Sequence, residues 1–401
     1  QHGGSLAMIR VRGGMSGPWG ALLSHVCGVL AVAGVFGLPF LLQRAWPGLA
    51  YGAVKVIAFT AQPQSCHCPP GAGTSSSRRK DAIIYLVQKK RMPMLLNSLA
   101  ALHQHFNGCF RKDVLLFHNG DFTAEDQAGI IKTYPLVQFH YLEVGGKYWR
   151  VPPEVENSGP WRSTKGYNEG YRHMCRFHYK MAFEYLADRG YDWFMRLDDD
   201  SFILSCIDYD MFQFMEDNNY TYGWRLSQLE YHDFAGLLPD MVDQYMRKHR
   251  LTLSYDLGSH YEGGTLSNES WDRWTYYNNF MMTRIAWWRK PAVSAWLSEV
   301  DSSGIAYLHR VGDAPIQTFT RMMFMPKAEV HHFQDFTYHH GPVIALSINS
   351  VLPKFARSLL LEDDQPLEWV GGLHDMAEHA LHRPVMQWVN YLLIRLNMTW
   401  W

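Results

Sequence analysis

Three consecutive carboxylates stand near the middle of the chain, directly after a short apolar run. The run 191–197 is rich in aromatic residues, and Asp198, Asp199 and Asp200 follow it at once. Such a run is typical of a buried strand, and ligands bind at the carboxyl ends of strands in open α/β sheets. Asp198 and Asp200 could both face one cation, and carboxylates suit Mg²⁺ or Mn²⁺ that also binds a substrate's phosphates. An acidic turn that closes a surface strand is the alternative interpretation.

Two groups of basic residues could bind phosphates beside such an ion. Arg172 and Arg176 are four residues apart in a segment with a helical pattern, so they would share one helix face. The cluster Lys89-Lys90-Arg91 follows the first predicted strand and could meet a diphosphate at a helix N-terminus. Each group also fits a solvated helix surface without a ligand, and the spacing alone leaves both interpretations open.

A second pair of aspartates, Asp208 and Asp210, repeats the spacing of Asp198 and Asp200. This pair precedes the apolar run 211–215, and the pattern predicts the N-cap region of a helix better than a second metal site. The ion is therefore expected at the first pair.

The segments before the acidic strand alternate between strand and helix patterns. Apolar runs at 81–87, 114–121 and 137–142 predict strands, and spaced leucines between 95 and 102 predict a helix after the first strand. Strand, helix and strand in this order are typical of a parallel sheet in an α/β fold. The sequence contains neither Gly-x-Gly-x-x-Gly nor the Lys-bearing phosphate loop, so neither a dinucleotide-binding fingerprint nor a P-loop is expected.

Size and charge narrow the class of protein. The chain has 401 residues, of which 47% are hydrophobic, so it can bury a large core in one or two domains. The formal net charge is -1 and there is no long basic run. Because a nucleic-acid surface needs many lysines and arginines, no nucleic-acid partner is expected.

The N-terminal part has the composition of a membrane anchor followed by a linker. Residues 19–42 carry no charged side chain, and at 1.5 Å per residue such a helix crosses a bilayer core of about 30 Å. We therefore predict a short cytoplasmic tail at 1–18, a transmembrane anchor at 19–42 and a stem or linker at 43–80. A cleaved signal peptide is the alternative, although its apolar core would be unusually long.

Cysteines and glycosylation motifs bear on the compartment of the chain body. Of six cysteines, Cys27 lies in the predicted anchor, and the five others cannot all pair within one chain. Disulfides are thus possible without being forced. Asn219, Asn268 and Asn397 each begin an Asn-x-Ser/Thr motif, which agrees with a lumenal body.

Further along, several motifs occur in a fixed order over residues 81 to about 342. They are Tyr171-Arg172-His173-Met174-Cys175-Arg176-Phe177, Tyr191-Asp192-Trp193, Cys206-Ile207-Asp208-Tyr209-Asp210, Asp217-Asn218-Asn219-x-Thr221-Tyr222-Gly223, Asn279-Phe280, Gly312-Asp313-Ala314-Pro315 and His331-x-Phe333-x-Asp335-x-x-Tyr338-His339-His340. In order and spacing they resemble the fungal α-1,2-mannosyltransferases of glycosyltransferase family 15. So many ordered matches are more specific than any single motif.

The resemblance implies a fold and an activity. The fold is a GT-A-like nucleotide-diphospho-sugar transferase domain at 81–345, with a mixed, mostly parallel central sheet flanked by helices. The activity is transfer of mannose from GDP-mannose, with Mn²⁺, to a glycan or glycoprotein acceptor with retention at the anomeric carbon. The location is the Golgi membrane, as a single-pass type II protein with a lumenal catalytic domain. After it, 346–401 would form a helical extension, and its apolar stretch 386–394 is too short for a second span.

The family's metal ligands carry over to three positions of this sequence. Asp198 and Asp200 fall on the acidic metal motif, which in the family is usually Glu-Pro-Asp, and His340 falls on the histidine ligand. Two carboxylates and one imidazole, together with diphosphate oxygens, would make a reasonable octahedral Mn²⁺ site. Without the resemblance, a His-His pair more often belongs to a solvated turn.

Other active-site positions carry over in the same way. Tyr171 falls on the family's active-site tyrosine, and Asp313 falls on an aspartate that could bind sugar hydroxyls or accept the acceptor's proton. Structural roles are the alternatives: packing for Tyr171, and the cap of a helix beginning at Pro315 for Asp313. The further candidate substrate-binding residues are Arg172, Arg176, Asp199 and Asn279.

Two positions depart from the family pattern. The family has a glutamate directly after Asn-Phe, proposed as nucleophile or as stabiliser of the sugar, whereas this chain has Met281. A thioether can neither attack an anomeric carbon as a carboxylate does nor stabilise an oxocarbenium ion by charge. The family's Arg-Asn after the first strand is Gln88-Lys89 here, which bears on nucleotide recognition.

These departures leave several functions open. Transfer could proceed on the front face, with the leaving phosphate assisting the acceptor, or could use another acid such as Asp313. The chain could also use a different nucleotide sugar, or be a catalytically silent, membrane-anchored glycan-binding protein. Retention of all three metal-ligand positions argues against silence, and a metal-dependent hydrolase is a more distant alternative.

Overall fold

The computed structural model of the protein describes residues 66–73, 79–156, 158, 161, 168–231, 237–252, 254–261, 266–341, 343–345 and 347. The predicted tail at 1–18, the anchor at 19–42, most of the stem and nearly all of the C-terminal extension, with Asn397, lie outside these residues. Within the described part of the chain, no helix is both long and apolar enough to cross a membrane.

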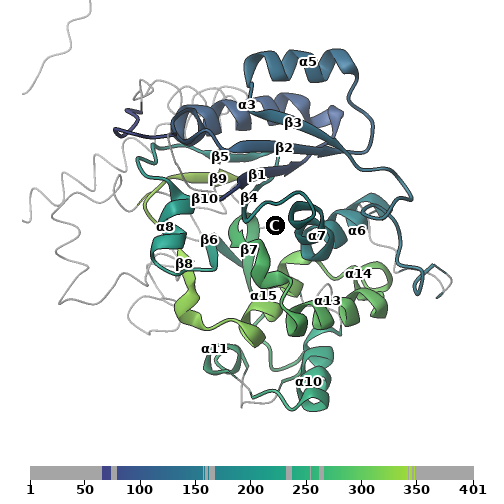
Figure 1. Cartoon of the computed structure of the whole chain (residues 1–401). Coiled ribbons are helices and arrows are strands. Elements are labelled where there is room, and N and C mark those ends of the chain that lie inside the picture. The colour runs from purple at the N-terminus through teal and green to yellow at the C-terminus, as the bar shows by residue number, and fades with distance from the viewer. Residues whose placement is uncertain are drawn as a thin grey trace, which may run out of the picture. The chain divides into compact units, whose positions relative to one another are not determined.

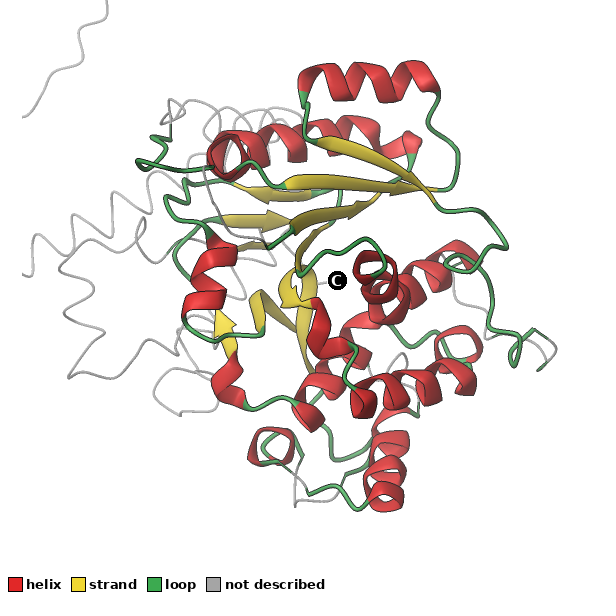
Figure 2. Cartoon of the chain, in the orientation of Figure 1, coloured by secondary structure: helices red, strands yellow, loops and turns green. Residues whose placement is uncertain are grey.

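A seven-stranded mixed sheet forms the centre of the fold (Figures 1 and 2). Its order is β3-β2-β1-β4-β7-β6-β8, and the pairs β3–β2, β2–β1, β1–β4 and β6–β8 are parallel, whereas β7 runs antiparallel to both of its neighbours. This confirms the predicted α/β fold with a mixed, mostly parallel sheet. The strands are β1 Asp81–Leu86, β2 Asp113–His118, β3 Val137–Tyr141, β4 Trp193–Leu197, β6 Tyr222–Leu229, β7 Trp274–Arg284 and β8 Val330–His332.

The central strands are buried on both faces, because successive side chains point to opposite faces and both faces are covered. In β1, Ala82 and Ile84 belong to one hydrophobic cluster, while Ile83 and Tyr85 belong to the other. This burial explains why the strands appear in the sequence as continuous apolar runs rather than as alternating patterns.

Two sets of helices provide these covers (Figure 1). The cluster around Ile83 includes residues of α3 Met92–Leu102, η2 His103–Asn107, α4 Gly108–Phe110, α5 Ala124–Thr133 and α8 Met211–Asp217. The cluster around Ile84 includes residues of η3 Phe177–Met181, α7 Ala182–Ala187, α10 Leu238–His249, α11 Tyr255–Gly258, α12 Ile285–Trp288, α13 Pro291–Ser303, α14 Ile305–Leu308 and α15 Asp313–Phe324. The remaining helical segments are η1 Lys89–Arg91, α6 Glu169–Arg176 and η5 Lys327–Glu329.

Helix α8 begins where the second aspartate pair predicts a cap. Asp210 is its N-cap, and its carboxylate accepts hydrogen bonds from the backbone amides of Phe212 and Gln213. Its other oxygen lies 2.7 Å from Lys112 Nζ. The capping role predicted for this pair is confirmed.

A second, three-stranded antiparallel sheet brings the C-terminal histidines to the acidic motif. Its order is β10-β9-β5, with β5 Ser201–Ile203, β9 Tyr338–His340 and β10 Val343–Ala345. Ser201 pairs with His340. Because β5 begins directly after Asp200, this pairing carries His340 to the end of β4.

Strand β7 bulges beside the same place. Trp224 of β6 pairs with Met281 and Leu226 pairs with Tyr277, so the single residue Arg225 opposes Asn278, Asn279 and Phe280. Extra residues in one strand re-aim side chains, and such bulges are common next to active sites. Here Asn278 contacts α15, while Asn279 contacts β9.

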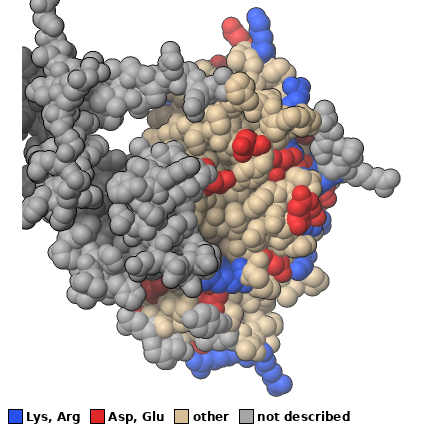
Figure 3. All heavy atoms as spheres, turned by 90° about the vertical axis from the view of Figure 1, so that its left-hand side faces the viewer, with Lys and Arg blue, Asp and Glu red and all other residues tan. Residues whose placement is uncertain are grey.

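Two disulfides attach the Cys-x-Cys segment to the folded body. Cys66 is bonded to Cys206 and Cys68 to Cys109, and Cys175 is buried and free. The predicted stem at 43–80 therefore holds residues that belong structurally to the body. On the described surface in Figure 3, acidic and basic side chains are interspersed.

Candidate active site

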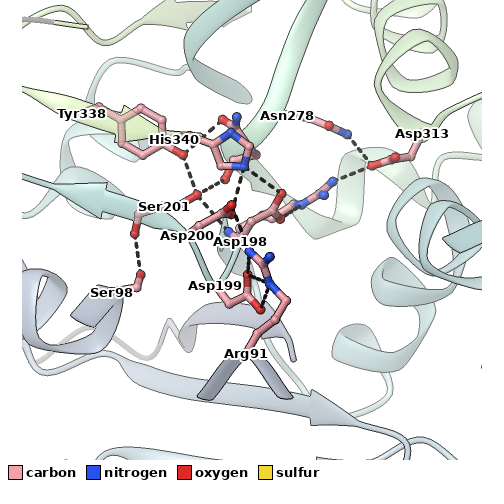
Figure 4. A network of polar contacts seen from close by, with 12 residues as sticks. Arg91, Ser98, Asp198, Asp199, Asp200, Ser201, Asn278, Asp313, Tyr338 and His340 are labelled. Atoms are coloured by element: carbon pink, nitrogen blue, oxygen red, sulfur yellow. Dashed lines mark hydrogen bonds and ion pairs between the residues drawn. The ribbon is translucent and has the colours of Figure 1, made fainter. Parts of the chain in front are cut away.

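Asp198, Asp200 and His340 meet at the carboxyl end of β4 (Figure 4). His340 Nε2 lies 3.2 Å from Asp200 Oδ1 and 3.6 Å from Asp198 Oδ2. The two aspartates come from the turn between β4 and β5, and the histidine comes from the paired strand β9. The structure thus brings together the three residues that the resemblance assigned to the metal.

Opposite charges hold these three side chains to one another. Burial alone would lower the pKa of His340, but hydrogen bonds and charge interactions with Asp198 and Asp200 raise it to about 9. Burial would raise the carboxyl pKa values, but Arg196 and His340 lower that of Asp198, and His340 lowers that of Asp200. The imidazole therefore carries a proton that a metal ion would displace.

Two carboxylates and one imidazole fit a divalent ion such as Mn²⁺ in their chemistry. In the described part of the chain, however, no three His, Cys, Asp or Glu side chains are arranged as a ready metal cluster. One carboxylate oxygen of each aspartate contacts an arginine. Arg196 Nε donates to Asp198 Oδ1 at 3.0 Å, and Arg91 Nη2 lies 2.9 Å from Asp200 Oδ2. The oxygens that face His340, Asp198 Oδ2 and Asp200 Oδ1, are the other two.

Arg91 links the acidic motif to the first strand. From η1, directly after β1, its Nε lies 2.8 Å from both oxygens of Asp199, and its Nη2 lies 2.6 Å from Asp199 Oδ1. Asp199 is buried, and this burial raises its pKa even though Arg91 opposes the shift. Asp199 therefore orients Arg91 at the site, and Arg91 in turn holds Asp200.

Arg196 connects the acidic motif to Asp313. Arg196 is only 4% exposed, and its Nη1 donates to Asp313 Oδ2 at 2.5 Å while its Nε donates to Asp198. Asn278 Nδ2 donates to the same Asp313 oxygen at 2.8 Å. Burial would raise the pKa of Asp313, but the charge of Arg196 lowers it, so the carboxyl group is ionised. Asp313 is the first residue of α15, which begins there rather than at Pro315.

Asn279 lies in a polar cluster behind the metal ligands. Tyr338 Oη lies 3.1 Å from Asn279 Oδ1 and 2.7 Å from Ser201 Oγ. Ser201 Oγ in turn accepts a hydrogen bond from the backbone amide of Asp198 at 3.1 Å. Asn279 is 1% exposed, so it supports the turn that carries the aspartates from behind, at a distance from the solvent.

A cavity of about 710 Å³ opens in front of the acidic motif. This volume suits a small-molecule ligand. Its walls come from the ends of β1, β2 and β4, from η1, and from α6 and η3. The described residues that line it are Leu86, Val87, Gln88, Lys90, Arg91, His118, Asn119, Leu142, Trp149, Asn168, Gly170, Tyr171, Met174, His178, Arg196, Asp198, Asp199 and Asp200.

Tyr171 lies in the first turn of α6, where it faces this cavity. Asn168 caps the helix by accepting a hydrogen bond from the backbone amide of Tyr171 at 3.2 Å. Arg310 Nη2 lies 3.1 Å from the Tyr171 hydroxyl, and its guanidinium lies 4.9 Å from the centre of the ring. Burial raises the pKa of Tyr171, so the hydroxyl stays protonated and can donate a hydrogen bond.

Arg172 and Arg176 point elsewhere, although they stand on the same helix. Both are buried and neither is among the described residues of the cavity wall. Arg172 donates to the carbonyl of Tyr307, and Arg176 pairs with the Asp301 carboxylate at 2.7 and 2.9 Å. The structure therefore buries both guanidinium groups, away from the described cavity wall and from the solvated surface that the sequence left open. Spacing indicates that two residues share a face but not what covers that face.

Met281 lies in the core, where the family's glutamate would stand. It is fully buried, and it pairs across β4 and β7 with Arg196. It is not among the described residues of the cavity wall. The chain therefore places no carboxylate at this position, and Arg196 finds its acidic partners in Asp198 and Asp313.

Sequence reasoning missed Arg196, Arg310 and His178. Arg196 stands inside an apolar strand, Arg310 precedes the Gly312-Asp313 motif, and His178 follows Phe177 in the resembling motif. A charged residue within a buried strand is a signal in itself, because burial requires a partner. The two others offered no pattern, since their roles depend on contacts across the fold.

Comparisons with known proteins agree with this geometry. The family described as glycolipid 2-alpha-mannosyltransferase matches residues 58–356. Alpha-1,2 mannosyltransferase KTR1 of Saccharomyces cerevisiae is 27% identical over 288 residues, which are 68% of this chain and 71% of the relative. O-glycoside alpha-1,2-mannosyltransferase omh1 of Schizosaccharomyces pombe is 21% identical, over 66% of this chain and 70% of the relative.

Solved structures show the same fold. The mannosyltransferase Ktr4p from S. cerevisiae superimposes with a TM-score of 0.59 at 22% identity, covering 69% of this chain and 73% of that one. Core-mannan synthase A from Aspergillus fumigatus, in its Mn/GDP form, gives the same TM-score at 22% identity, covering 68% and 78%. The Ktr4p complex with GDP gives 0.60 at 21% identity, covering 71% and 77%.

The fold and the site thus define an α/β protein of the GT-A-like class. Within that class the chain can be assigned to one family, because the matching family model covers most of the chain and includes Asp198, Asp200 and His340. This chain belongs to glycosyltransferase family 15, the glycolipid 2-alpha-mannosyltransferase family.

Proposed function

We propose that the protein is a Mn²⁺-dependent retaining mannosyltransferase that transfers mannose from GDP-mannose to a mannose-containing glycan, with an α-1,2 linkage. The convergence of Asp198, Asp200 and His340, with both aspartates in the cavity wall, carries this proposal. Relatives named as alpha-1,2 mannosyltransferases and a homologous structure in a Mn/GDP form support the donor, the ion and the linkage.

Asp198, Asp200 and His340 would hold Mn²⁺ or Mg²⁺ through the atoms that already face one another. When bound, such an ion supplies Lewis-acid stabilisation of the departing diphosphate. Arg91 fixes the second oxygen of Asp200, and Arg196 fixes the second oxygen of Asp198. Salt-bridged ligands of this kind are pre-oriented, which is the usual function of the residues behind a metal site.

Asp313 and Tyr171 act on the sugar in this proposal. Asp313 is ionised, and Arg196 and Asn278 hold its carboxylate by one oxygen, Oδ2. Asp313 is 5% exposed and, unlike Arg196, is not among the described residues of the cavity wall, so in this proposal it acts on the sugar by positioning Arg196 rather than by direct contact. The hydroxyl of Tyr171, which accepts from Arg310, stays protonated in the cavity wall and so has a proton to donate to a sugar oxygen. Since Met281 offers no carboxylate, we propose front-face transfer, in which a phosphate oxygen of the leaving group assists the acceptor hydroxyl.

The compartment belongs to the same proposal: a Golgi membrane protein of the single-pass type II kind, anchored by 19–42. Two disulfides in the body support an oxidising compartment. Asn219 supports it too, because this first residue of a glycosylation motif is exposed in a turn. A loss of mass on enzymatic deglycosylation that is smaller for Asn219→Gln than for the wild type would test lumenal exposure of this residue.

Donor turnover tests the activity directly. The full chain, purified under oxidising conditions, would be given a panel of nucleotide sugars with mannose oligosaccharides as acceptors, in Mn²⁺ or in EDTA. We expect Mn²⁺-dependent release of GDP from GDP-mannose, an α-configured product, and no turnover by Asp200→Ala. A folded wild-type protein that uses no donor with any acceptor would refute the proposal and favour a silent glycan-binding protein.

A second candidate function, the same reaction with another nucleotide sugar, is favoured by one observation. Gln88 lines the cavity, but Lys89 turns away, and its Nζ lies 2.6 Å from Asp126 Oδ2. The family's Arg-Asn pair is thus replaced by one neutral side chain in the cavity and one salt bridge outside it. Turnover of a different donor in the same panel would identify this case.

A further inference from the structure

His178 is a buried histidine whose ring forms part of the cavity wall. It is 3% exposed and lines the cavity together with Tyr171 and Met174 of the preceding helix. Within the described part of the chain, the imidazole contacts the ring of Phe177, at 5.5 Å between centres, and makes no hydrogen bond or ion pair. Its ring nitrogens are not among the fully buried polar atoms of the described residues that lack a partner, so the open cavity reaches them and water or a ligand can bind there.

The backbone holds His178 in this place. The residue lies in η3, a π-helical turn between α6 and α7, and such turns occur frequently at functional sites. Gln317 of α15 donates from Nε2 to the His178 carbonyl at 2.9 Å, and Gln317 Oε1 accepts from Asn278. The same Asn278 side chain also binds Asp313. The position of His178 is therefore tied to that of the Asp313 carboxylate.

The imidazole is neutral in this setting. Burial, together with the nearby charge of Arg196, lowers the pKa of His178 to about 3, against the opposing effects of Asp313 and Asp198. A neutral imidazole has one N–H donor and one nitrogen acceptor. This combination complements a hydroxyl group, which is also both a donor and an acceptor, better than it complements a phosphate, which accepts only.

We propose that His178 binds a hydroxyl group of a sugar in the cavity and thereby determines which glycosyl group is accepted. The proposal rests on the proposed function, because it assumes that the cavity receives a nucleotide sugar. Two sources offer the same chemistry: the sugar of the donor and the terminal sugar of the acceptor. The cationic wall at Lys90 and Arg91 is left for the diphosphate.

Three variants separate binding from packing. His178→Phe keeps an aromatic ring of similar size and removes both polar atoms, whereas His178→Asn restores a donor and an acceptor. His331→Phe is the matched control, because His331 is packed against Phe214, Tyr220 and Phe333, at 4.6 to 4.9 Å between ring centres, away from the cavity. Thermal unfolding of each variant would show that the fold is retained.

Equilibrium binding is the first readout, since it does not depend on catalysis. We would measure the dissociation constants of GDP-mannose and of GDP for the wild type and for the variants. If His178 binds the donor sugar, His178→Phe weakens GDP-mannose by roughly 10–100-fold, leaves GDP unchanged, and is partly rescued in His178→Asn. Deoxy analogues of GDP-mannose then identify the hydroxyl, because the variant no longer distinguishes the analogue that lacks it.

The acceptor arm is measured by steady-state kinetics. If His178 binds the acceptor sugar, the KM of the oligosaccharide rises in His178→Phe while the binding of both nucleotides stays as in the wild type. The inference is overturned if a folded His178→Phe protein matches the wild type both in nucleotide-sugar binding and in the KM of the acceptor.

The outcome also separates this inference from the proposed function. The wild type could bind one nucleotide sugar more tightly than its nucleotide, lose this difference in His178→Phe, and still turn over no donor. This result would refute the proposed transferase activity and support the sugar contact of His178. Two results together would overturn the sugar contact itself. No nucleotide sugar of the panel would bind more tightly than its nucleotide, and His178→Phe would leave acceptor binding unchanged.

Discussion

Arg196 and Asp313 form a buried ion pair across 117 residues of sequence, with Nη1 and Oδ2 at 2.5 Å. The same guanidinium donates to Asp198, so one arginine connects a metal-ligand position with the carboxylate at the start of α15. The positions of Asp198 and of the Asp313 carboxylate are therefore not independent.

We expect Arg196→Met to impair both stability and activity. It leaves Asp313 buried without its cation, and breaking such a pair costs about 3–5 kcal/mol in the free energy of unfolding. It also frees Asp198, so kcat should fall by roughly 100-fold or more. Denaturant unfolding and donor turnover would measure the two effects. Arg247→Met, which removes an exposed pair with Asp243, is the control and should change neither. Unaltered kcat in a folded Arg196→Met protein would show that the bridge is dispensable.

The two Asp-x-Asp pairs are expected to differ in metal binding. Asp200→Asn and His340→Ala should weaken Mn²⁺ binding by more than the roughly 10–100-fold typical of residues behind the ligands. Asp208→Asn, in the exposed position of the capping pair, should bind Mn²⁺ as the wild type does. Calorimetric titration of metal-free protein would compare the three. Equal weakening in Asp208→Asn would contradict the assignment.

Met281 should prove to be a packing residue. Met281→Leu keeps the apolar volume, so we expect a loss of less than about 1.5 kcal/mol in stability and a kcat near that of the wild type. Met281→Glu should not raise kcat, because the side chain is fully buried beside Arg196 and would compete for the cation that holds Asp313. A gain of activity in Met281→Glu would show that a nucleophile at this position can still reach the sugar.

The Arg176–Asp301 pair should matter for stability alone. Asp301 also accepts from Tyr179 and Lys180, each at 2.9 Å, and Asp301→Asn is expected to cost several kcal/mol of unfolding free energy without changing the KM of the donor. Burial would raise the pKa of Asp301, but Arg176 and Lys180 lower it. Its carboxylate therefore stabilises the fold above the unfolded pKa of about 4, and this stability is lost as the pH falls below that value. Unfolding of the wild type and of Asp301→Asn at pH 7 and at pH 3 would show whether the difference in stability shrinks at low pH, as expected. A higher KM of the donor in Asp301→Asn would indicate a role for Arg176 in donor binding.

The strands could be predicted from the sequence because burial on both faces leaves continuous apolar runs. Residues 81–87, 137–142 and 191–197 each contain the strand expected there. The aspartates could be placed for the same reason, since they end a strand. The position of His340 beside the aspartates could be predicted only from the resemblance, because it depends on the pairing of β9 with β5.

The arginines show why the rest could not be predicted. Arg172 and Arg176 share a helix face as their spacing indicates, yet α13 and α14 supply the groups that they bind. Arg91 lines the cavity, where the sequence left a phosphate contact open, and its ion pairs with Asp199 and Asp200 of the turn after β4 could not be predicted from its position after β1. Local pattern determines the direction of a side chain, whereas tertiary packing determines its partner.

The Cys66–Cys206 disulfide determines where the N-terminal segment is attached to the folded body. Residues 66–80 fully extended would span roughly 50 Å, and an unattached segment of that length would let the site swing widely about its point of attachment. The disulfides instead fix Cys66 and Cys68 to the body, the first of them in the segment that follows β5. The chain therefore joins the body near the end of β5, the strand that begins directly after Asp200, and residues 66–80 add nothing to the distance over which a preceding segment could carry the body.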